Sequence, residues 1–206
     1  QPEERNGVNI RCSIVSSAGG SLMCTAFVEG PRGESVSGAL VNVSDSSNQI
    51  TQLAYDYNSG SYSGRIEENT GTYIFGIRSL LLDEPRRIAV PYTAITRSPS
   101  VMVLQDSEGN SALNGEYLNA GLPIQAAWSS SGSGIVYQIS VRTPLRTFYA
   151  VSTNAETITI PGNAIPQGTF TLGISAQKIY GDPSFETSDY YSLSNSATVG
   201  MSFNVN

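Results

Sequence analysis

The sequence predicts an all-β fold made of two tandem antiparallel β-sandwiches. The chain has 206 residues, about twice the roughly 100 residues of one such sandwich. Apolar side chains alternate at period two and nowhere keep helical spacing for more than about two turns. Turn-forming residues are frequent, with 20 glycines and 10 prolines. Together these features predict many short strands joined by tight turns, with little helix.

The stretch Leu122–Val141 carries the only tryptophan of the chain, Trp128. It reads as two strands joined by a Ser/Gly turn, and apolar residues alternate along the second strand: Ile135, Tyr137, Ile139 and Val141. A buried indole with neighbours at this spacing needs an opposing sheet. This stretch therefore predicts a sandwich, not a single sheet.

The first module is predicted to span residues 1–95, after a frayed leader at residues 1–7. Seven short strands are expected in it: Val8–Val15, Leu22–Glu29, Val36–Val43, Ile50–Tyr57, Tyr62–Ile66, Tyr73–Leu80 and Ile88–Tyr92. The succession Gly38-Ala39-Leu40-Val41-Asn42-Val43, Gly60-Ser61-Tyr62 and Gly71-Thr72-Tyr73 resembles carboxypeptidase-regulatory-like and transthyretin-like (prealbumin-like) modules. That resemblance implies an accessory module without catalytic activity.

The second module is predicted to span residues 96–206, after a short polar link near Thr93–Ser98. Its order resembles a fibronectin type III domain, with Trp128 on the second strand, Tyr137 on the third, and Pro166-Gln167-Gly168-Thr169-Phe170 before a later one. Phe170 departs from the tyrosine that usually occupies this corner, and it lacks the hydroxyl that binds backbone there.

The two cysteines flank a hairpin turn signal, Ser16–Ser21. With a turn centred on Ala18, Cys12 would lie opposite Cys24, in a geometry that permits a cross-strand disulfide. The alternative is two buried thiols. We expect the disulfide, and because disulfides persist in oxidising surroundings it favours an extracytoplasmic location.

Composition excludes several classes of function. The chain has no histidine, which removes the commonest general base and zinc ligand. Its net charge of −6, without a basic stripe, argues against nucleic acid and an anionic membrane surface. No apolar run is long enough for a transmembrane helix, and without a signal-like segment the chain is expected to start after any signal peptide or to have been trimmed. We expect no cofactor, no metal and a monomer.

Minor sites have ordinary explanations. Oxygen-rich turns at Asp45–Asn48 and Asp106–Asn110 could hold calcium, but turn chemistry explains both. Lys178, the only lysine, could form at most one isopeptide bond and is expected to be solvated. Tyr55, Tyr57 and Tyr62 alternate about a turn and are expected in the core.

The best candidate for a binding site is the connection between the last two strands, about residues 180–192. A hairpin loop usually has 2–5 residues, so this connection is long. It gathers aromatic and acidic side chains, of which six are the predicted ligand-binding residues: Tyr180, Asp182, Phe185, Asp189, Tyr190 and Tyr191. Exposed rings beside carboxylates suit a sugar or a protein hot spot; the alternative is that some rings cap the sandwich.

The sequence thus predicts a non-catalytic extracytoplasmic protein, secreted, periplasmic or anchored at the cell surface as a lipoprotein or fragment. Adhesion, scaffolding or protein binding is the expected role, with a protein or glycan of the cell surface as partner. The alternative is a carbohydrate-binding accessory module of a secreted or surface enzyme system.

Overall fold

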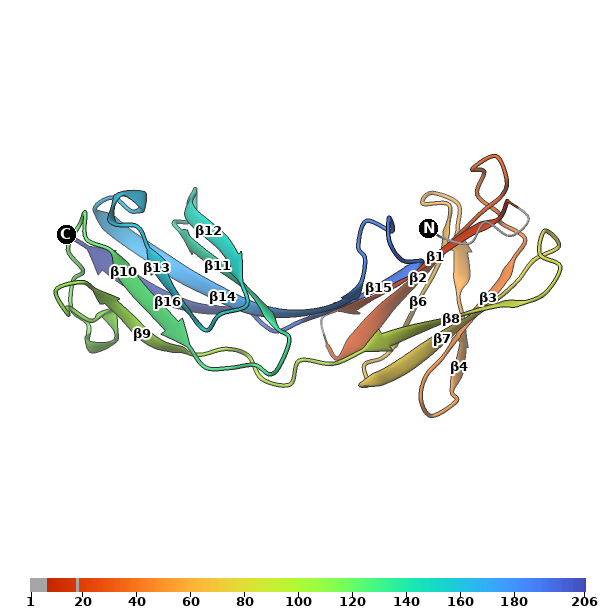
Figure 1. The fold of residues 1–206 in the computed structure, drawn as a ribbon, viewed down its shortest axis with the longest axis horizontal. Helices are drawn as coiled ribbons and strands as arrows, with labels where there is room; N and C mark the ends of the chain where they lie inside the picture. Colours follow the sequence, from red (N-terminus) through yellow and green to blue (C-terminus); the bar gives the residue numbers. More distant parts are fainter. Residues whose placement is uncertain (1–6, 18) are drawn as a thin grey trace. The chain divides into compact units, whose positions relative to one another are not determined.

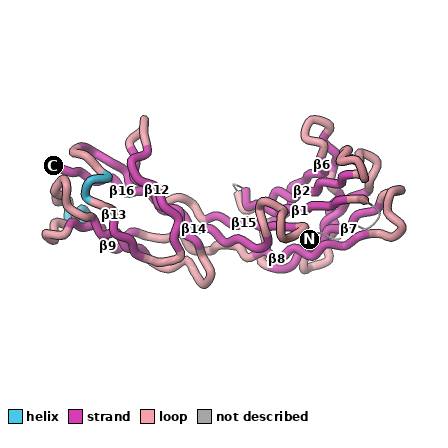
Figure 2. The backbone as a smooth tube through the Cα atoms, turned by 45° about the horizontal axis from the view of Figure 1, so that its top comes forward, coloured by secondary structure: helices cyan, strands magenta, loops and turns pink. Residues whose placement is uncertain are grey.

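A computed structural model describes residues 7–17 and 19–206 of the chain. Strands dominate it, and two short 3-10 turns, Ala112–Asn114 and Gly162–Ala164, are the helical segments of the described part (Figures 1 and 2). The predicted all-β fold of β-sandwiches is confirmed. Of the predicted leader, residues 1–6 lie outside the described residues, as does residue 18. Within the described residues, no helix is long and apolar enough to span a membrane.

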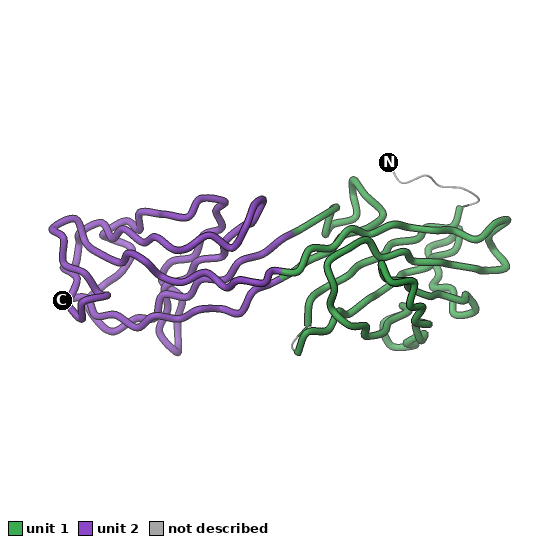
Figure 3. The backbone as a smooth tube through the Cα atoms, turned by 90° about the horizontal axis from the view of Figure 1, so that it is seen from below, with its two compact units in different colours: residues 1–94, 179–194 green, residues 95–178, 195–206 purple. Residues whose placement is uncertain are grey.

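The chain divides into two compact units (Figure 3). Unit 1 consists of residues 1–94 and 179–194, and unit 2 consists of residues 95–178 and 195–206. The predicted division into residues 1–95 and 96–206 differs from these units mainly in the placement of one segment. Residues 179–194, expected in the second module, belong to unit 1 because part of the segment forms a strand in its sheet.

Unit 1 has two sheets that enclose one core. The larger sheet has the strand order β15-β1-β2-β6-β5, and the smaller has the order β4-β3-β7-β8. Their bounds are β1 Asn9–Ser17, β2 Ser21–Glu29, β3 Leu40–Ser44, β4 Ile50–Gln52, β5 Ala54–Asp56, β6 Ser61–Glu67, β7 Gly71–Arg78, β8 Arg86–Tyr92 and β15 Tyr190–Asn195.

Alternation along these strands builds the core as predicted. On β3, Val41 and Val43 are buried, and on β7, Tyr73, Phe75 and Ile77 are buried. The hydroxyl of Tyr73 donates to the carbonyl oxygen of Asn69 at 2.7 Å, so this buried ring keeps its polar end hydrogen-bonded.

The predicted disulfide is not formed: both cysteines are free and fully buried. β1 pairs with β2 so that Ser17 lies opposite Ser21, which centres the hairpin on residue 19 and not on residue 18. Cys12 therefore lies opposite Ala26, and Cys24 opposite Ile14. A shift of one residue in the turn centre moves each partner by two, so both thiols still face the core but no longer face each other.

β15 lies parallel to β1, whereas the pairs β1–β2, β2–β6 and β5–β6 of the same sheet are antiparallel. Cys12 lies opposite Tyr190, Ser13 opposite Tyr191 and Ile14 opposite Ser192. Parallel neighbours need a long connection between them. Here the chain between β1 and β15 includes the whole of residues 95–178, so this pairing joins residues far apart in sequence.

Unit 2 is a β-sandwich with sheets of order β13-β10-β9 and β12-β11-β14, the latter extended by β16 on β14. Their bounds are β9 Val101–Asp106, β10 Ile124–Trp128, β11 Val136–Arg142, β12 Thr147–Thr153, β13 Thr157–Ile160, β14 Gly168–Gly181 and β16 Val199–Val205. The two strands joined by the Ser/Gly turn, β10 and β11, lie in different sheets. Trp128 therefore meets Tyr137 across the core, with ring centroids 5.4 Å apart.

Phe170, which lacks the hydroxyl of a tyrosine, is held by contacts with other aromatic rings. Its ring is buried, with its centroid 5.2 Å from that of Phe148 and 5.9 Å from that of Phe203. Aromatic contact thus stabilises this corner in place of a hydrogen bond.

Candidate functional site

The six predicted site residues lie on one segment, residues 179–194. This segment belongs to unit 1, although the chain before and after it belongs to unit 2, and we call it the excursion. Tyr180 is on the end of β14, and Tyr190 and Tyr191 begin β15. Asp182, Phe185 and Asp189 lie in the loop between the two strands. The excursion is therefore a hairpin, with a loop of residues 182–189, and not an irregular connection.

The carboxylate of Asp182 organises this loop. Its Oδ1 accepts hydrogen bonds from the backbone N–H of Ser184 at 2.8 Å and from its hydroxyl at 2.7 Å. Its Oδ2 accepts from the backbone N–H of Glu186 at 3.0 Å, and from the N–H and hydroxyl of Thr187, each at 2.8 Å. These donors, the Ser184 hydroxyl first, hold the pKa of Asp182 well below its usual value. Asp182 thus acts as the structural acceptor of the loop.

Strand alternation sends the two tyrosines of β15 to opposite faces of the sheet. Tyr190 lies opposite Cys12, whose side chain faces inward, and it packs against the core of unit 1. Tyr191 lies opposite Ser13 and therefore faces outward. Of the two, only Tyr191 is placed to meet a partner.

An aromatic–arginine cluster forms on the outer face of the larger sheet of unit 1. It consists of Arg11 on β1, Phe27 on β2, Phe185 in the loop and Tyr191 on β15. The guanidinium carbon of Arg11 lies 5.5 Å from the ring centroid of Phe27 and 5.6 Å from that of Phe185. The rings of Phe185 and Tyr191 meet with centroids 5.3 Å apart and planes at 60°. All four side chains are half-buried.

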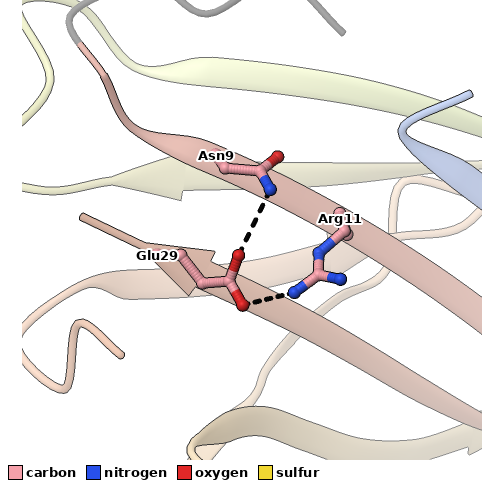
Figure 4. A network of polar contacts seen from close by, with 3 residues as sticks. All are labelled: Asn9, Arg11 and Glu29. Atoms are coloured by element: carbon pink, nitrogen blue, oxygen red, sulfur yellow. Dashed lines mark hydrogen bonds and ion pairs between the residues drawn. The ribbon is translucent and has the colours of Figure 1, made fainter. Parts of the chain in front are cut away.

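A charged network fixes the position of Arg11 (Figure 4). Its guanidinium pairs with Glu29 on β2, and the side-chain amide of Asn9 donates to the other oxygen of Glu29 at 3.2 Å. Because Glu29 restricts the side chain of Arg11, the guanidinium stays where both phenylalanine rings can contact it.

The aromatic–arginine cluster contains two of the six predicted residues, Phe185 and Tyr191. The hydroxyl of Tyr180 hydrogen-bonds with that of Thr93 at 2.9 Å. The carbonyl oxygen of Asp189 accepts from the backbone N–H of Cys12 at 2.8 Å, which ties the loop to β1. These residues hold the hairpin against unit 1, apart from the cluster.

Sequence reasoning missed Arg11, Phe27 and Glu29. The signal available was their position: they alternate with the buried residues of β1 and β2 and so share the outer face. The sequence did not indicate which segment contacts these residues on the outer face. That contact depends on the parallel pairing of β1 with β15, which lies about 180 residues further along the chain.

In both oxygen-rich turns, backbone N–H groups donate to the carboxylate oxygens that would have to coordinate a calcium ion. Asp45 Oδ1 accepts from the N–H groups of Ser47 and Gln49, each at 2.9 Å. Asp106, which is buried, accepts from the N–H of Asn110 at 3.0 Å and from that of Asn119 at 2.9 Å. Both carboxylates therefore serve their turns. Lys178 is not in such a turn, and its ammonium donates to the carbonyl oxygen of Ser133 at 2.7 Å.

The tyrosines of the first module divide between core and surface. Tyr62 is buried, and its hydroxyl donates to the carbonyl oxygen of Val36 at 2.7 Å. Tyr57, also expected in the core, is 84% exposed and meets Tyr55 edge-on with ring centroids 4.9 Å apart. The turn at residues 57–60 begins at Tyr57, so the alternation of β5 does not extend to this ring.

No family model and no curated protein matches the chain. Among solved structures, it is similar to the FN1–FN3 domains of chicken CNTN1, with a TM-score of 0.41, 13% identity, and 94% of this chain and 63% of that chain covered. It is also similar to the BSP domain of a biofilm-associated protein, with a TM-score of 0.30, 14% identity, and 94% and 29% of the two chains covered. The ligand-binding domain of human OSCAR gives a TM-score of 0.30 at 10% identity, with 94% and 97% covered.

Proposed function

We propose that this chain is a non-catalytic extracytoplasmic surface protein, or a fragment of one, that acts in adhesion, scaffolding or protein binding. The observation that carries this proposal is the aromatic–arginine cluster on the outer face of unit 1. Arginine and aromatic residues are enriched at the energetic centres of protein interfaces, and here they are partly exposed and held in place before any partner binds.

The electrostatics of the described carboxylates support the non-catalytic part of the proposal. Hydrogen bonds lower the pKa of Asp45, chiefly from the Ser47 hydroxyl, and that of Asp56, chiefly from the N–H of Asn58. Burial raises the pKa of Asp106, but hydrogen bonds from Asn110 and Asn119 outweigh it and lower the value. Carboxylates held ionised in this way are poor proton donors near neutral pH.

The module resemblance supports the proposed location. The free thiols remove the disulfide as an argument for oxidising surroundings. Burial raises the pKa of Cys12, with Asp189 adding to it, and raises that of Cys24 to about 12, so both thiols are unreactive in the folded unit. Two parts of the proposal rest on the pattern of glycine and tyrosine residues in the first module: the extracytoplasmic location and the resemblance to carboxypeptidase-regulatory-like modules. Tyr62 and Tyr73 of this pattern are both buried.

The proposal is tested by measuring binding of the full chain to panels of immobilised cell-surface proteins and glycans. The variants are Tyr191→Ala and Phe185→Ala, and the matched control is Tyr57→Ala, an exposed ring of unit 1 outside the cluster. We expect binding to one or more proteins that falls about tenfold or more in both cluster variants and is retained in the control. Glycan binding alone would favour the carbohydrate-binding alternative, and a loss restricted to the control would place the site elsewhere.

A further inference from the structure

One edge of the larger sheet of unit 1 is open along the second half of β6. This strand pairs with β2 along residues 62–67, but with β5 on its other side only along residues 61–63. In the described part of the chain, no strand pairs with Arg65 or Glu67 on that other side. The sheet therefore ends there in an exposed strand edge, to which a further strand can add.

Backbone groups of two residues point out of this edge. The N–H of Glu68 donates to the carbonyl oxygen of Gly20 at 3.0 Å, so Glu68 faces β2. Because hydrogen-bonded and non-hydrogen-bonded pairs alternate along an antiparallel ladder, Arg65 and Glu67 face away from β2. The carbonyl oxygen of Glu67 lies 3.5 Å from the hydroxyl of Tyr73, a weak contact. Both N–H groups and the carbonyl oxygen of Arg65 have no partner among the described residues.

The edge is open because the chain that would cover it changes sheets. Leu53, which is buried, links β4 to β5, and its N–H donates to the carbonyl oxygen of Val41 in the smaller sheet at 2.9 Å. The change occurs beside Gly64, where a Cβ atom would lie 2.9 Å from Leu53 Cδ2. β5 therefore pairs with the larger sheet and β4 with the smaller, and a wedge opens between β4 and β6 beyond Gly64.

A cavity of about 300 Å³ occupies this wedge. Its volume is at the lower end of the range for ligand pockets. Two inward-facing apolar side chains line it, Val43 from the smaller sheet, which is buried, and Ile66 from the larger sheet, which is half-buried. Arg65 and Glu67, both exposed, line it beside their open backbone groups. The wedge thus has room for an apolar side chain next to an unpaired strand edge.

The charges of the wedge differ between its two ends. Arg65 is next to Gly64, where the wedge is closed by Leu53. Glu67 lies further along β6, toward the open end, where Asp45 lines the opposite wall. The carboxylate of Asp45 stays ionised, because hydrogen bonds from Ser47 lower its pKa. The closed end therefore carries a positive charge and the open end two negative charges.

We propose that the wedge binds an extended peptide segment of a partner protein, which adds as an antiparallel strand beside β6. The open backbone groups are two residues apart, the repeat at which a strand presents its own, so they fit a peptide backbone. The peptide side chain opposite Ile66 would point inward toward Val43. Its two neighbours would lie opposite Glu67 and Arg65, so charge complementarity defines the order, from the N-terminus, as basic, apolar and acidic. No residue of the aromatic–arginine cluster lines the wedge, so this site is independent of the cluster.

An NMR titration of the isotope-labelled full chain tests this proposal. The probe is the peptide acetyl-Ser-Thr-Lys-Val-Glu-amide, and we expect saturable shifts of the backbone amides of Arg65 and Glu67. The matched control is acetyl-Ser-Thr-Glu-Val-Lys-amide, which has the same composition with the two charges exchanged. It should bind at least about fivefold more weakly. Absence of shifts at these two amides, or equal binding of both peptides, would overturn the proposal.

Methylation of the peptide backbone distinguishes strand addition from contact between charged side chains alone. A methyl group on the nitrogen of the peptide glutamate removes the donor to the carbonyl oxygen of Arg65, and binding should weaken by at least about tenfold. The same change on the peptide valine affects an N–H that faces away from β6, and binding should stay within about threefold. Similar losses for both methylated peptides would count against a strand beside β6.

Exchanging the charges of the chain tests the assigned order. Arg65→Glu/Glu67→Arg changes two exposed side chains and should reverse the preference between the two peptides. The control Glu84→Arg/Arg87→Glu, two exposed residues of unit 1 outside the wedge, should keep the preference of the parent. Circular dichroism confirms the fold of each variant. An unchanged preference in the first variant, or a parent dimer that the peptide does not dissociate, would overturn the proposal.

Discussion

Units 1 and 2 are both β-sandwiches, but they are completed in different ways. Unit 2 forms its two sheets from strands that follow one another in the chain, interrupted only by the excursion at residues 179–194. Unit 1 has eight strands before Ala94 and takes its ninth, β15, from that excursion. The difference shows that a β-sandwich can look complete in a contiguous stretch of sequence and still lack a strand that a distant segment supplies.

The largest expected effect comes from removing the excursion. Replacing residues 180–193 by Asn-Gly should leave unit 2 folded, whereas unit 1 should lose β15 and the hydrogen bond from the N–H of Cys12. The two units carry separate probes, because the only tryptophan is in unit 2 and both cysteines are in unit 1. We expect native Trp128 fluorescence together with rapid thiol labelling, and protected thiols would show that unit 1 is complete without the excursion.

The next largest effect concerns the two cores. Phe75→Ala removes a fully buried ring of unit 1 and should cost about 3–5 kcal/mol of its unfolding free energy. Leu172→Ala in unit 2 should cost about 2–5 kcal/mol. In urea unfolding, the first substitution should shift the midpoint for thiol labelling and the second the midpoint for Trp128 fluorescence. Equal shifts of both probes by either variant would mean that the cores do not act separately.

A smaller contrast lies within β15 itself. Tyr190 packs against the core of unit 1, so Tyr190→Ala should cost about 1–3 kcal/mol. Tyr191 faces outward, and Tyr191→Ala should cost less than about 1 kcal/mol. Urea unfolding followed by thiol labelling measures both values. The reverse order would place β15 in the other register, with Tyr191 inside.

The smallest effect is the pH dependence of the loop of residues 182–189. The pKa of Asp182 is lower in the folded chain than in the unfolded chain, where it is about 3.9. The ionised carboxylate therefore stabilises the folded loop fully above the unfolded pKa, and this stabilisation is lost as the pH falls toward the folded pKa. Hydrogen exchange of Ser184, Glu186 and Thr187, corrected for intrinsic rates, should therefore lose protection below about pH 4. In Asp182→Asn the loss should already be present at neutral pH; unchanged protection in this variant would remove Asp182 from its structural role.

Much of the fold follows from alternation in the sequence, as Tyr73, Phe75 and Ile77 on β7 and Tyr137 and Ile139 on β11 illustrate. Alternation works there because large apolar side chains mark the buried face. It fails on β15, whose inward positions include Ser192, 1% exposed, with its hydroxyl bonded to the carbonyl oxygen of Pro91. A buried serine leaves no apolar signal, so the sequence of this strand resembles that of a loop.

The candidate site was predictable only in part for a related reason. Composition and loop length pointed to the segment that contains Phe185 and Tyr191. The contact of Phe185 with Arg11 depends on the register of a parallel pair joined by a very long connection, and no local pattern encodes that register. The turn of the first hairpin gives the same lesson on a smaller scale, since a displacement of one residue separated Cys12 from Cys24.

The parallel pairing of β15 with β1 is the contact that completes unit 1, and solution NMR of the full chain can detect it. Parallel pairing predicts cross-strand contacts between the backbones of Ser13 and Tyr191 and of Ile14 and Ser192, with slow exchange of the Cys12 amide. Observation of these contacts would establish that residues 179–194 complete unit 1. Fast exchange at Cys12, with residues 190–194 showing no contact to β1, would contradict it.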